Sequence, residues 1–276
     1  MFYTKLRGLY PSLTYSETKI ADFILANKDT VSTLTSQQLA DKLGISQPTV
    51  IRFSKKLGYR SYRNLILDLE RSEIEDSVVE EIQVSDSTQL TNAKIKSYAN
   101  KLFDIVDEVN DPSDYDKTIE YILKAKIIFC YGFLSTSSIA QYMNDLLQLF
   151  GFNSYCMDNY STMSALRNQG SDGLLLVFSK SGETAVTNEV ASYAKERGLT
   201  VVGVTSMVDN TLSKSLDVWF KVVYSPLKTR FLHYTETIAQ SYVVDCIILN
   251  LYKHDVTRYN ECAAEHRALT RGSFNS

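Results

Sequence analysis

Apolar residues recur with two different periods along the chain. Up to about residue 72 they follow helical spacing, as in a helix expected over 14–28, where Ile20, Phe23 and Ile24 share one face. From Lys126 onward, short apolar runs alternate with amphipathic stretches, as in parallel strands joined by helices. The pattern predicts an all-helical N-terminal part, followed by an α/β part built on a doubly wound parallel sheet.

Two short helices are expected over 36–43 and 46–57, and each begins with a serine that can cap it. Gly44 separates them, and Pro48 falls in the first turn of the second helix, which tolerates proline. The apolar residues of the second helix form one stripe: Val50, Phe53 and Leu57. Two helices joined by a tight turn, the second with basic residues off its stripe, indicate a helix-turn-helix.

The polar residues around the second helix suit DNA. Those near its start would reach base edges, as in a recognition helix: Ser46, Gln47, Thr49 and Arg52. The basic residues that follow are placed for phosphates: Lys55, Lys56, Arg60 and Arg63. Such helix pairs also occur in proteins that never meet DNA, and a basic run can be only a solvated surface. Pattern, caps and the absence of acids over 46–63 together favour double-stranded DNA.

Charge divides the chain near the same point. Residues 1–72 hold eleven Lys and Arg against six Asp and Glu, a net charge of +5, whereas residues 73–276 carry −8. Six acids and no bases lie over 73–86, as in a linker or an exposed helix end. We expect a helix-turn-helix domain over 1–72, an acidic linker with a connecting helix over 73–110, and a ligand-binding domain with C-terminal helices over 111–276.

Three blocks of the N-terminal part resemble the DNA-binding domain of RpiR-type bacterial regulators: Leu13–Ala21, Gln38–Phe53 and Lys56–Tyr59. The resemblance covers residues 2 to about 72 without a gap. It implies that the chain binds operator DNA as a dimer.

In the second part, strands are expected over 126–131, 152–157, 173–178, 199–205 and 216–223. Doubly wound sheets bind ligands beyond the C-terminal ends of their strands, and two hydroxyl-rich segments fall there. The first follows Gly132 and contains Ser135, Thr136 and Ser137. The second contains Ser179, Ser181, Gly182 and Thr184, of which the glycine permits close approach of an anion. Ordinary helix capping or a plain turn would account for each segment equally well.

The motif Ser179-x-Ser-Gly-x-Thr184, with the segments 198–206 and 210–212, is similar to a sugar isomerase (SIS) domain. The resemblance runs from about Ile119 to Tyr252. It implies that these hydroxyls and the loop after Gly132 bind a phosphorylated sugar. The pattern usually has a second glycine two residues after the first, where this chain has Leu134.

A phosphosugar isomerase needs a base and often a histidine, and the available groups are Glu183, His233 and Glu236. The last two lie on one face at the start of a helix expected over 230–253, where they contact the ligand or serve the structure. An isomerase has no use for a DNA-binding domain. We therefore expect a sugar-metabolism regulator rather than an enzyme, with no catalytic residue. A phosphosugar isomerase and a non-catalytic phosphosugar-binding adaptor are the alternatives.

Composition narrows the remaining possibilities. The four cysteines form no C-x-x-C pair and three lie in apolar runs, so we expect buried free thiols and neither a metal site nor a cofactor. No apolar run is long enough to cross a membrane, which predicts a cytoplasmic protein. One apolar side of the last expected helix suits a homodimer or homotetramer interface, or packing on the sheet: Tyr234, Ile238, Tyr242, Leu249 and Tyr252.

Overall fold

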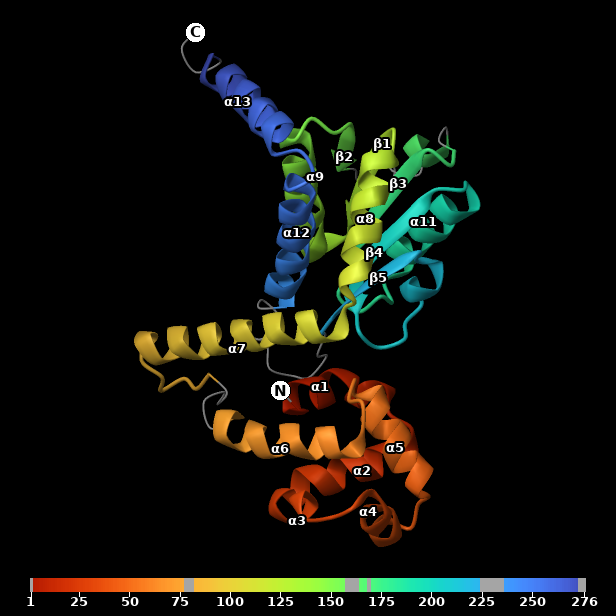
Figure 1. Ribbon diagram of the computed structural model, residues 1–276, viewed down its shortest axis with the longest axis vertical. Coiled ribbons are helices and arrows are strands. Elements are labelled where there is room, and N and C mark those ends of the chain that lie inside the picture. Colours follow the sequence, from red (N-terminus) through yellow and green to blue (C-terminus); the bar gives the residue numbers. More distant parts are fainter. Residues whose placement is uncertain (1, 77–81, 157–163, 168–169, 224–235, 273–276) are drawn as a thin grey trace. The chain divides into compact units, whose positions relative to one another are not determined.

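The computed structural model describes residues 2–76, 82–156, 164–167, 170–223 and 236–272. The described residues fall into two compact units: those up to Val109 together with Val223, and Asn110–Val222 together with those from Glu236 onward (Figure 1). The expected all-helical part and the expected parallel-sheet part are both confirmed.

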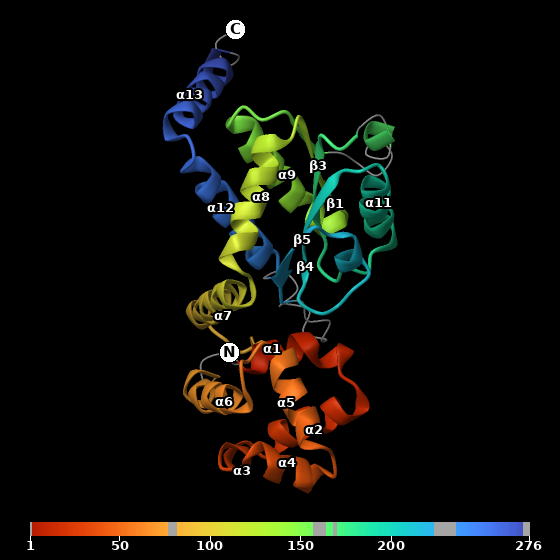
Figure 2. The same ribbon diagram turned by 45° about the vertical axis from the view of Figure 1, so that its right-hand side comes forward.

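The first unit is helical. Its helices are α1 (Phe2–Leu9), α2 (Tyr15–Ala26), α3 (Lys28–Ser32), α4 (Ser36–Leu43), α5 (Gln47–Lys56), α6 (Tyr62–Asp76) and α7 (Thr88–Val109). The predicted stripe of Val50, Phe53 and Leu57 is fully buried where α5 packs against α2 and α4, whose Ile20 and Leu39 are also fully buried. Figure 2 shows α4 and α5 as the consecutive helices of the predicted helix-turn-helix.

Local capping fixes the ends of these helices. Thr14 caps α2 and Thr35 caps α4, each through a reciprocal box with a side chain three residues on. The cap of α4 is therefore one residue earlier than the predicted Ser36. Gly44 ends α4 in the left-handed conformation, with φ of 65°, which glycine adopts without strain.

A buried lysine lies in the core of this unit. The side chain of Lys5 in α1 is fully buried, and its ammonium lies 2.6 Å from the carboxylate of Glu108 in α7. The same ammonium lies 4.5 Å from the ring centroid of Tyr59, in the turn after α5. A buried cation requires such partners, because removal from water is otherwise costly. Lys5 thus ties α7 to the turn that follows α5.

The second unit contains five parallel strands in the order β2-β1-β3-β4-β5. They are β1 (Ile127–Gly132), β2 (Ser154–Cys156), β3 (Gly173–Phe178), β4 (Thr200–Ser206) and β5 (Val218–Val222). All five predicted strands are present. Burial on both faces explains the continuous apolar runs that revealed them, as in β3, where every residue is buried.

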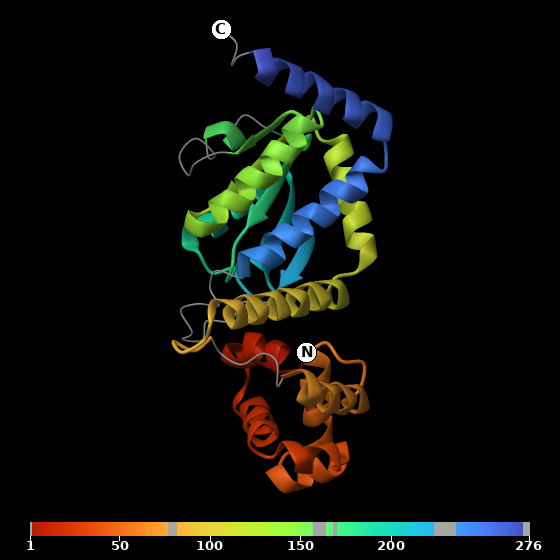
Figure 3. The same cartoon turned by 90° about the vertical axis from the view of Figure 1, so that its left-hand side faces the viewer.

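Helices cover both faces of the sheet. α8 (Pro112–Lys124), α9 (Ser137–Leu149) and α12 (Glu236–Tyr252) pack together on one face, while α11 (Ala185–Glu196) packs on the other (Figures 2 and 3). α13 (Val256–Gly272) contacts α9. The fold is the predicted doubly wound one. From β1 the chain continues to β2 at one edge of the sheet, whereas from β3 it continues to β4 on the opposite side.

Helix α12 is apolar on more than one side. Its buried row contacts the sheet and neighbouring helices: Ala239, Val243, Val244, Ile247 and Leu251. The predicted interface stripe lies largely outside this row, and its Leu249 is 62% exposed. Tyr234 of that stripe lies outside the described residues, as do residues 230–235 of the helix expected over 230–253.

The four cysteines are free thiols. Cys130 in β1 is buried, and burial raises the pKa of its thiol well above the usual value. The other three are only partly buried, so the prediction of buried thiols holds fully for one of them.

Loss of the buried lysine should destabilise the first unit. We expect Lys5→Ala to lower the free energy of unfolding by about 3 kcal/mol, because it removes the ion pair and the ring contact and leaves a cavity. Lys5→Met, which retains most of the volume, should lower it less. Urea unfolding of the full chain, followed by circular dichroism, measures both. The exposed Lys96 in α7 is the control, and an equal loss in Lys96→Ala would contradict the assignment.

Candidate functional site

The two hydroxyl-rich loops meet at the centre of the sheet. β1 and β3 are neighbours, with Gly132 paired to Phe178 at their C-terminal ends. The chain leaves β1 toward β2 on one side and continues through β3 toward β4 on the other. This reversal of strand order makes a crevice where doubly wound proteins bind ligands. The predicted convergence of the two loops is thus present within the second unit.

The loop after β3 presents hydroxyl groups that are already oriented. The oxygen of Ser179 accepts a hydrogen bond from the amide of Gly182 at 3.0 Å, and that of Ser181 accepts one from the amide of Glu183 at 3.1 Å. Each hydroxyl hydrogen remains able to donate to a ligand. Thr184 occupies the cap position of α11 without a capping bond from its side chain, so the first amides of that helix are open to an anion.

Gly182 is required by the geometry of this loop. Its φ is 75°, and a Cβ atom at this position would lie 2.0 Å from the side-chain oxygen of Asn210. Asn210 is buried and donates to the carbonyls of Ser206 and Val208, which fixes the turn after β4. Sequence reasoning assigned no role to Asn210. Its position directly beside Gly182 could not be read from the residues alone.

Glu183 is committed to structure. Its carboxylate accepts hydrogen bonds from the amide of Thr211 at 2.9 Å and from the hydroxyl of the same residue at 2.6 Å. The amide of Leu212 donates to the carbonyl of Gly182. These bonds attach the loop after β3 to the turn after β4. A carboxylate held in this way is poorly placed to abstract a proton from a substrate.

The loop after β1 has one buried and several exposed hydroxyls. Thr136 is 4% exposed, and its hydroxyl donates to the carbonyl of Phe178 at 3.0 Å and accepts from the amide of Phe133. We therefore assign it a structural role in place of the predicted ligand contact. Ser135 and Ser137 are exposed, and Ser137 donates to the carbonyl of Leu134.

Helix α12 reaches this site through Gln240, which sequence reasoning also missed. The fully buried side-chain amide donates to the carbonyls of Ser179 at 3.1 Å and Val204 at 3.4 Å. Its oxygen is buried and has no hydrogen-bond partner in the described part of the chain. A lone amide in an otherwise apolar helix row was the available signal. Glu236 begins α12 one turn earlier, whereas His233 lies outside the described residues.

The first unit presents the predicted recognition helix. Ser46 and Arg52 are exposed and both contact the hydroxyl of Thr49, at 2.8 and 3.2 Å. Gln47 donates to the hydroxyl of Ser36, which links the starts of α5 and α4. The residues predicted to reach base edges therefore lie together around the start of α5.

All four basic residues assigned to phosphates are exposed: Lys55, Lys56, Arg60 and Arg63. Arg60 and Arg63 line a hollow of about 630 Å³ together with Thr35 and Ser36 at the start of α4. The amide end of a helix beside two guanidinium groups favours a phosphate group.

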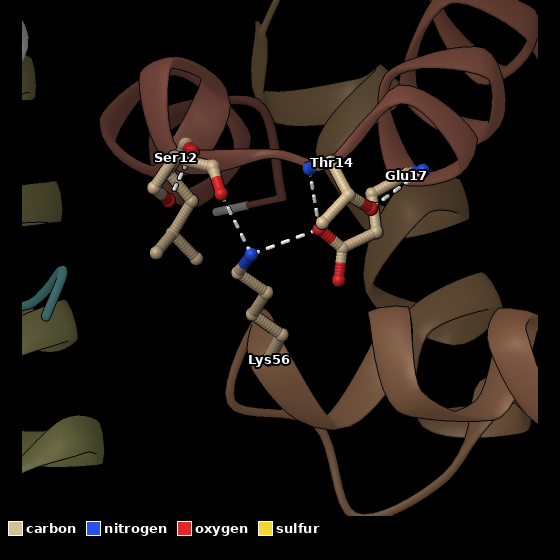
Figure 4. A network of polar contacts seen from close by, with 5 residues as sticks. Ser12, Thr14, Glu17 and Lys56 are labelled. Carbon is tan, nitrogen blue, oxygen red and sulfur yellow. Dashed lines mark hydrogen bonds and ion pairs between the residues drawn. The ribbon is translucent and has the colours of Figure 1, made fainter.

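Lys56 also makes bonds within the domain. Its ammonium donates to the carbonyl of Ser12 and to the carboxylate of Glu17, both at 2.8 Å (Figure 4). These contacts join the end of α5 to the start of α2. Lys56 therefore has a structural role, and its contact with phosphate stays a prediction.

Two other kinds of site are absent from the described residues. None of their helices is both long and apolar enough to cross a bilayer. No group of three or more His, Cys, Asp and Glu side chains in the same ranges is arranged to hold a metal ion.

Comparisons with known proteins agree with this arrangement. Residues 2–77 match the helix-turn-helix domain of the rpiR family, and residues 121–249 match the SIS domain. The chain is 25% identical over 274 residues to an uncharacterized HTH-type transcriptional regulator, YfhH, of Escherichia coli (strain K12), covering 97% of each chain. It is 27% identical over 221 residues to an uncharacterized HTH-type transcriptional regulator of Haemophilus influenzae, covering 77% of this chain and 76% of the relative.

Solved structures share the fold. The NanR protein of Vibrio vulnificus, complexed with ManNAc-6P, has a TM-score of 0.62 at 19% identity, covering 99% of this chain and 98% of that one. The sugar isomerase domain of an RpiR transcription factor from Sphaerobacter thermophilus has a TM-score of 0.55 at 15% identity, covering 64% of this chain and 98% of that domain.

The contact between Glu17 and Lys56 predicts a dependence of stability on pH. Burial alone would raise the pKa of Glu17, but hydrogen bonds from Lys56 and Thr14 outweigh it and lower the pKa from the usual 4.5. The ionised carboxylate therefore stabilises the fold above pH 4.5, and this contribution is lost as the pH falls through the lowered value.

We expect Lys56→Met to destabilise the first unit by about 1 kcal/mol at neutral pH and by less under acid conditions. Unfolding in urea at a series of pH values measures the difference. A constant difference between the two proteins across that series would contradict the assigned ion pair.

Proposed function

We propose that this chain, an RpiR-type protein with an rpiR-family helix-turn-helix domain and a SIS domain, is a DNA-binding transcriptional regulator controlled by a phosphorylated sugar. It acts in the cytoplasm, where it meets the chromosome, and needs no cofactor beyond the sugar phosphate. One observation carries the proposal. The hydroxyl-bearing loops after β1 and β3 meet where the strand order reverses, and the same chain contains the predicted recognition helix α5.

The chemistry of the site supports an anionic ligand. Ser179 and Ser181 retain hydroxyl hydrogens for a phosphate, and the open amides of α11 carry about half a positive charge at the helix start. Gln240 holds the carbonyl of Ser179 in place at the start of the loop after β3. The complex of NanR with ManNAc-6P, in a chain of similar fold, agrees with a sugar phosphate as the ligand.

The same site favours binding over catalysis. An isomerase needs a base near the carbon that loses its proton, and Glu183 gives both carboxylate oxygens to Thr211. Since solved relatives by fold include a putative sugar-phosphate isomerase of Listeria monocytogenes, turnover is the measurable alternative. Mixing the protein with aldose and ketose phosphates and following their interconversion distinguishes the two.

We propose further that the protein binds its operator as a homodimer or a homotetramer. Helix α12 leaves Leu249 exposed outside its buried row, and Ile238 and Tyr242 are only partly covered. Two-fold symmetry would match the paired half-sites that helix-turn-helix proteins bind. Sedimentation at micromolar concentration, with and without DNA, reports the assembly directly.

DNA binding should depend on two kinds of contact in the first unit. We expect Arg52→Ala to weaken binding to the preferred sequence about tenfold to a hundredfold and to relax the preference at one base pair. Lys55→Ala should weaken all sequences alike and reduce the dependence on salt. Binding to sequences selected from a random pool, measured by anisotropy over a salt series, tests both. Unaltered binding in the double variant would refute the assignment.

Ligand and DNA should influence each other. We expect Ser181→Ala to weaken binding of the sugar phosphate about tenfold or more, because a hydrogen bond to a charged group is worth about 1.5–3 kcal/mol. Binding of DNA without ligand should be unchanged. Ser192→Ala, at an exposed serine of α11, is the matched control.

The coupling itself is measured by titrating the sugar phosphate with and without operator DNA. Linkage requires the two effects to be equal. The factor by which DNA changes the affinity for the sugar phosphate must equal the factor by which the sugar phosphate changes the affinity for DNA. Equal affinities in the two titrations would leave a sugar-phosphate site without a regulatory role.

A further inference from the structure

Leu134 has an unusual backbone conformation. Its φ is 52°, and within the described ranges it is the one residue other than glycine with a positive φ. The left-handed region brings the Cβ atom of an L-residue too close to its own backbone, so a leucine here is strained. Strain of this kind persists where the surrounding structure imposes it, and it occurs frequently at ligand sites.

The surroundings of Leu134 impose this conformation. The amide of Phe133 donates to the hydroxyl of Thr136, and the hydroxyl of Ser137 donates to the carbonyl of Leu134 at 2.6 Å. Gly132 completes the turn, because a Cβ atom there would lie 2.3 Å from the carbonyl oxygen of Thr136. The turn is therefore closed by bonds and packing that do not involve the leucine side chain.

The side chain itself contributes little to the core. It is 75% exposed, so its burial does not offset the strain in the backbone. It projects from the loop after β1, and Thr136 attaches that loop to the carbonyl of Phe178, the residue immediately before Ser179. An exposed apolar side chain thus belongs to a loop that is bonded to β3 one residue before the loop with the predicted phosphate donors.

We propose that Leu134 forms an apolar wall of the ligand site and selects a sugar phosphate that carries an apolar substituent, such as the methyl group of an N-acyl chain. This inference rests on the proposed function. A leucine offers no hydrogen bond, so a hydroxyl or ammonium group pressed against it would lose water without replacement. A methyl group in the same place gains from leaving water. Glycine at this position would provide no such preference.

The experiment uses the full chain and matched pairs of ligands in calorimetric titrations. The probes are glucosamine 6-phosphate and mannosamine 6-phosphate, each compared with its N-acetyl form, together with fructose 6-phosphate and inorganic phosphate. We expect at least one N-acetyl form to bind about tenfold more tightly than its amine. In Leu134→Asn and Leu134→Gly this preference should fall to about twofold or less.

The strain has its own readout. Asparagine and glycine adopt the left-handed region more readily than leucine, so both variants should melt at a higher temperature than the parent without ligand. Leu123→Asn, at an exposed leucine of α8 outside the loop, is the control. It should not raise the melting temperature, and it should not alter the preference for the N-acetyl form.

The outcomes separate this inference from the function on which it rests. Three results would overturn the role of Leu134 alone. They are equal binding within each pair, an unchanged preference in Leu134→Asn, and failure of both N-acetyl forms to bind while other phosphates bind in a manner that depends on Ser181. Failure of every phosphate to bind in a manner that depends on Ser181 would overturn the proposed function as well.

Discussion

The hydrogen bond from Thr136 to the carbonyl of Phe178 holds the candidate ligand site together. The two loops of the site follow different strands, and parallel strands alone fix only where such loops begin. This single buried bond attaches the loop after β1 to the last residue of β3. With the bonds from Gln240 to Ser179 and from Leu212 to Gly182, it makes the site part of the sheet. The donors for a ligand are thus positioned before any ligand arrives.

Much of the fold could be predicted from the sequence, because its signals are local. The stripe of α5 and the five apolar strands depend on periods that neighbouring residues reveal. The predicted starts of α2, α4 and α5 agree with the structure to within one residue, since Thr35 and Ser36 are both able to cap α4 and only the turn geometry selects between them. The position of the site followed from the rule that ligands lie beyond the ends of parallel strands.

The roles of individual polar residues could not be predicted in the same way. Thr136 and Ser135 are adjacent hydroxyl residues in one loop, yet one is buried and bonded to a strand while the other is exposed. Lys55 and Lys56 are adjacent lysines, yet only Lys56 lies within reach of Glu17, 39 positions earlier. Composition and spacing treat such neighbours alike. The difference between them arises from the direction of each side chain, which brings Thr136 to the end of β3 and Lys56 to Glu17.

The network that builds the site also bears on whether the site can catalyse. Glu183 is the carboxylate nearest the phosphate donors along the chain, and in an isomerase a nearby carboxylate would be expected to move a proton. Here it joins the loop after β3 to the turn after β4 by accepting two bonds from Thr211. Freeing it for chemistry would loosen the turn that places Gly182 against Asn210. A rigid loop after β3 and a free base at Glu183 are therefore in conflict, and this conflict supports the proposed sensor over the alternative isomerase.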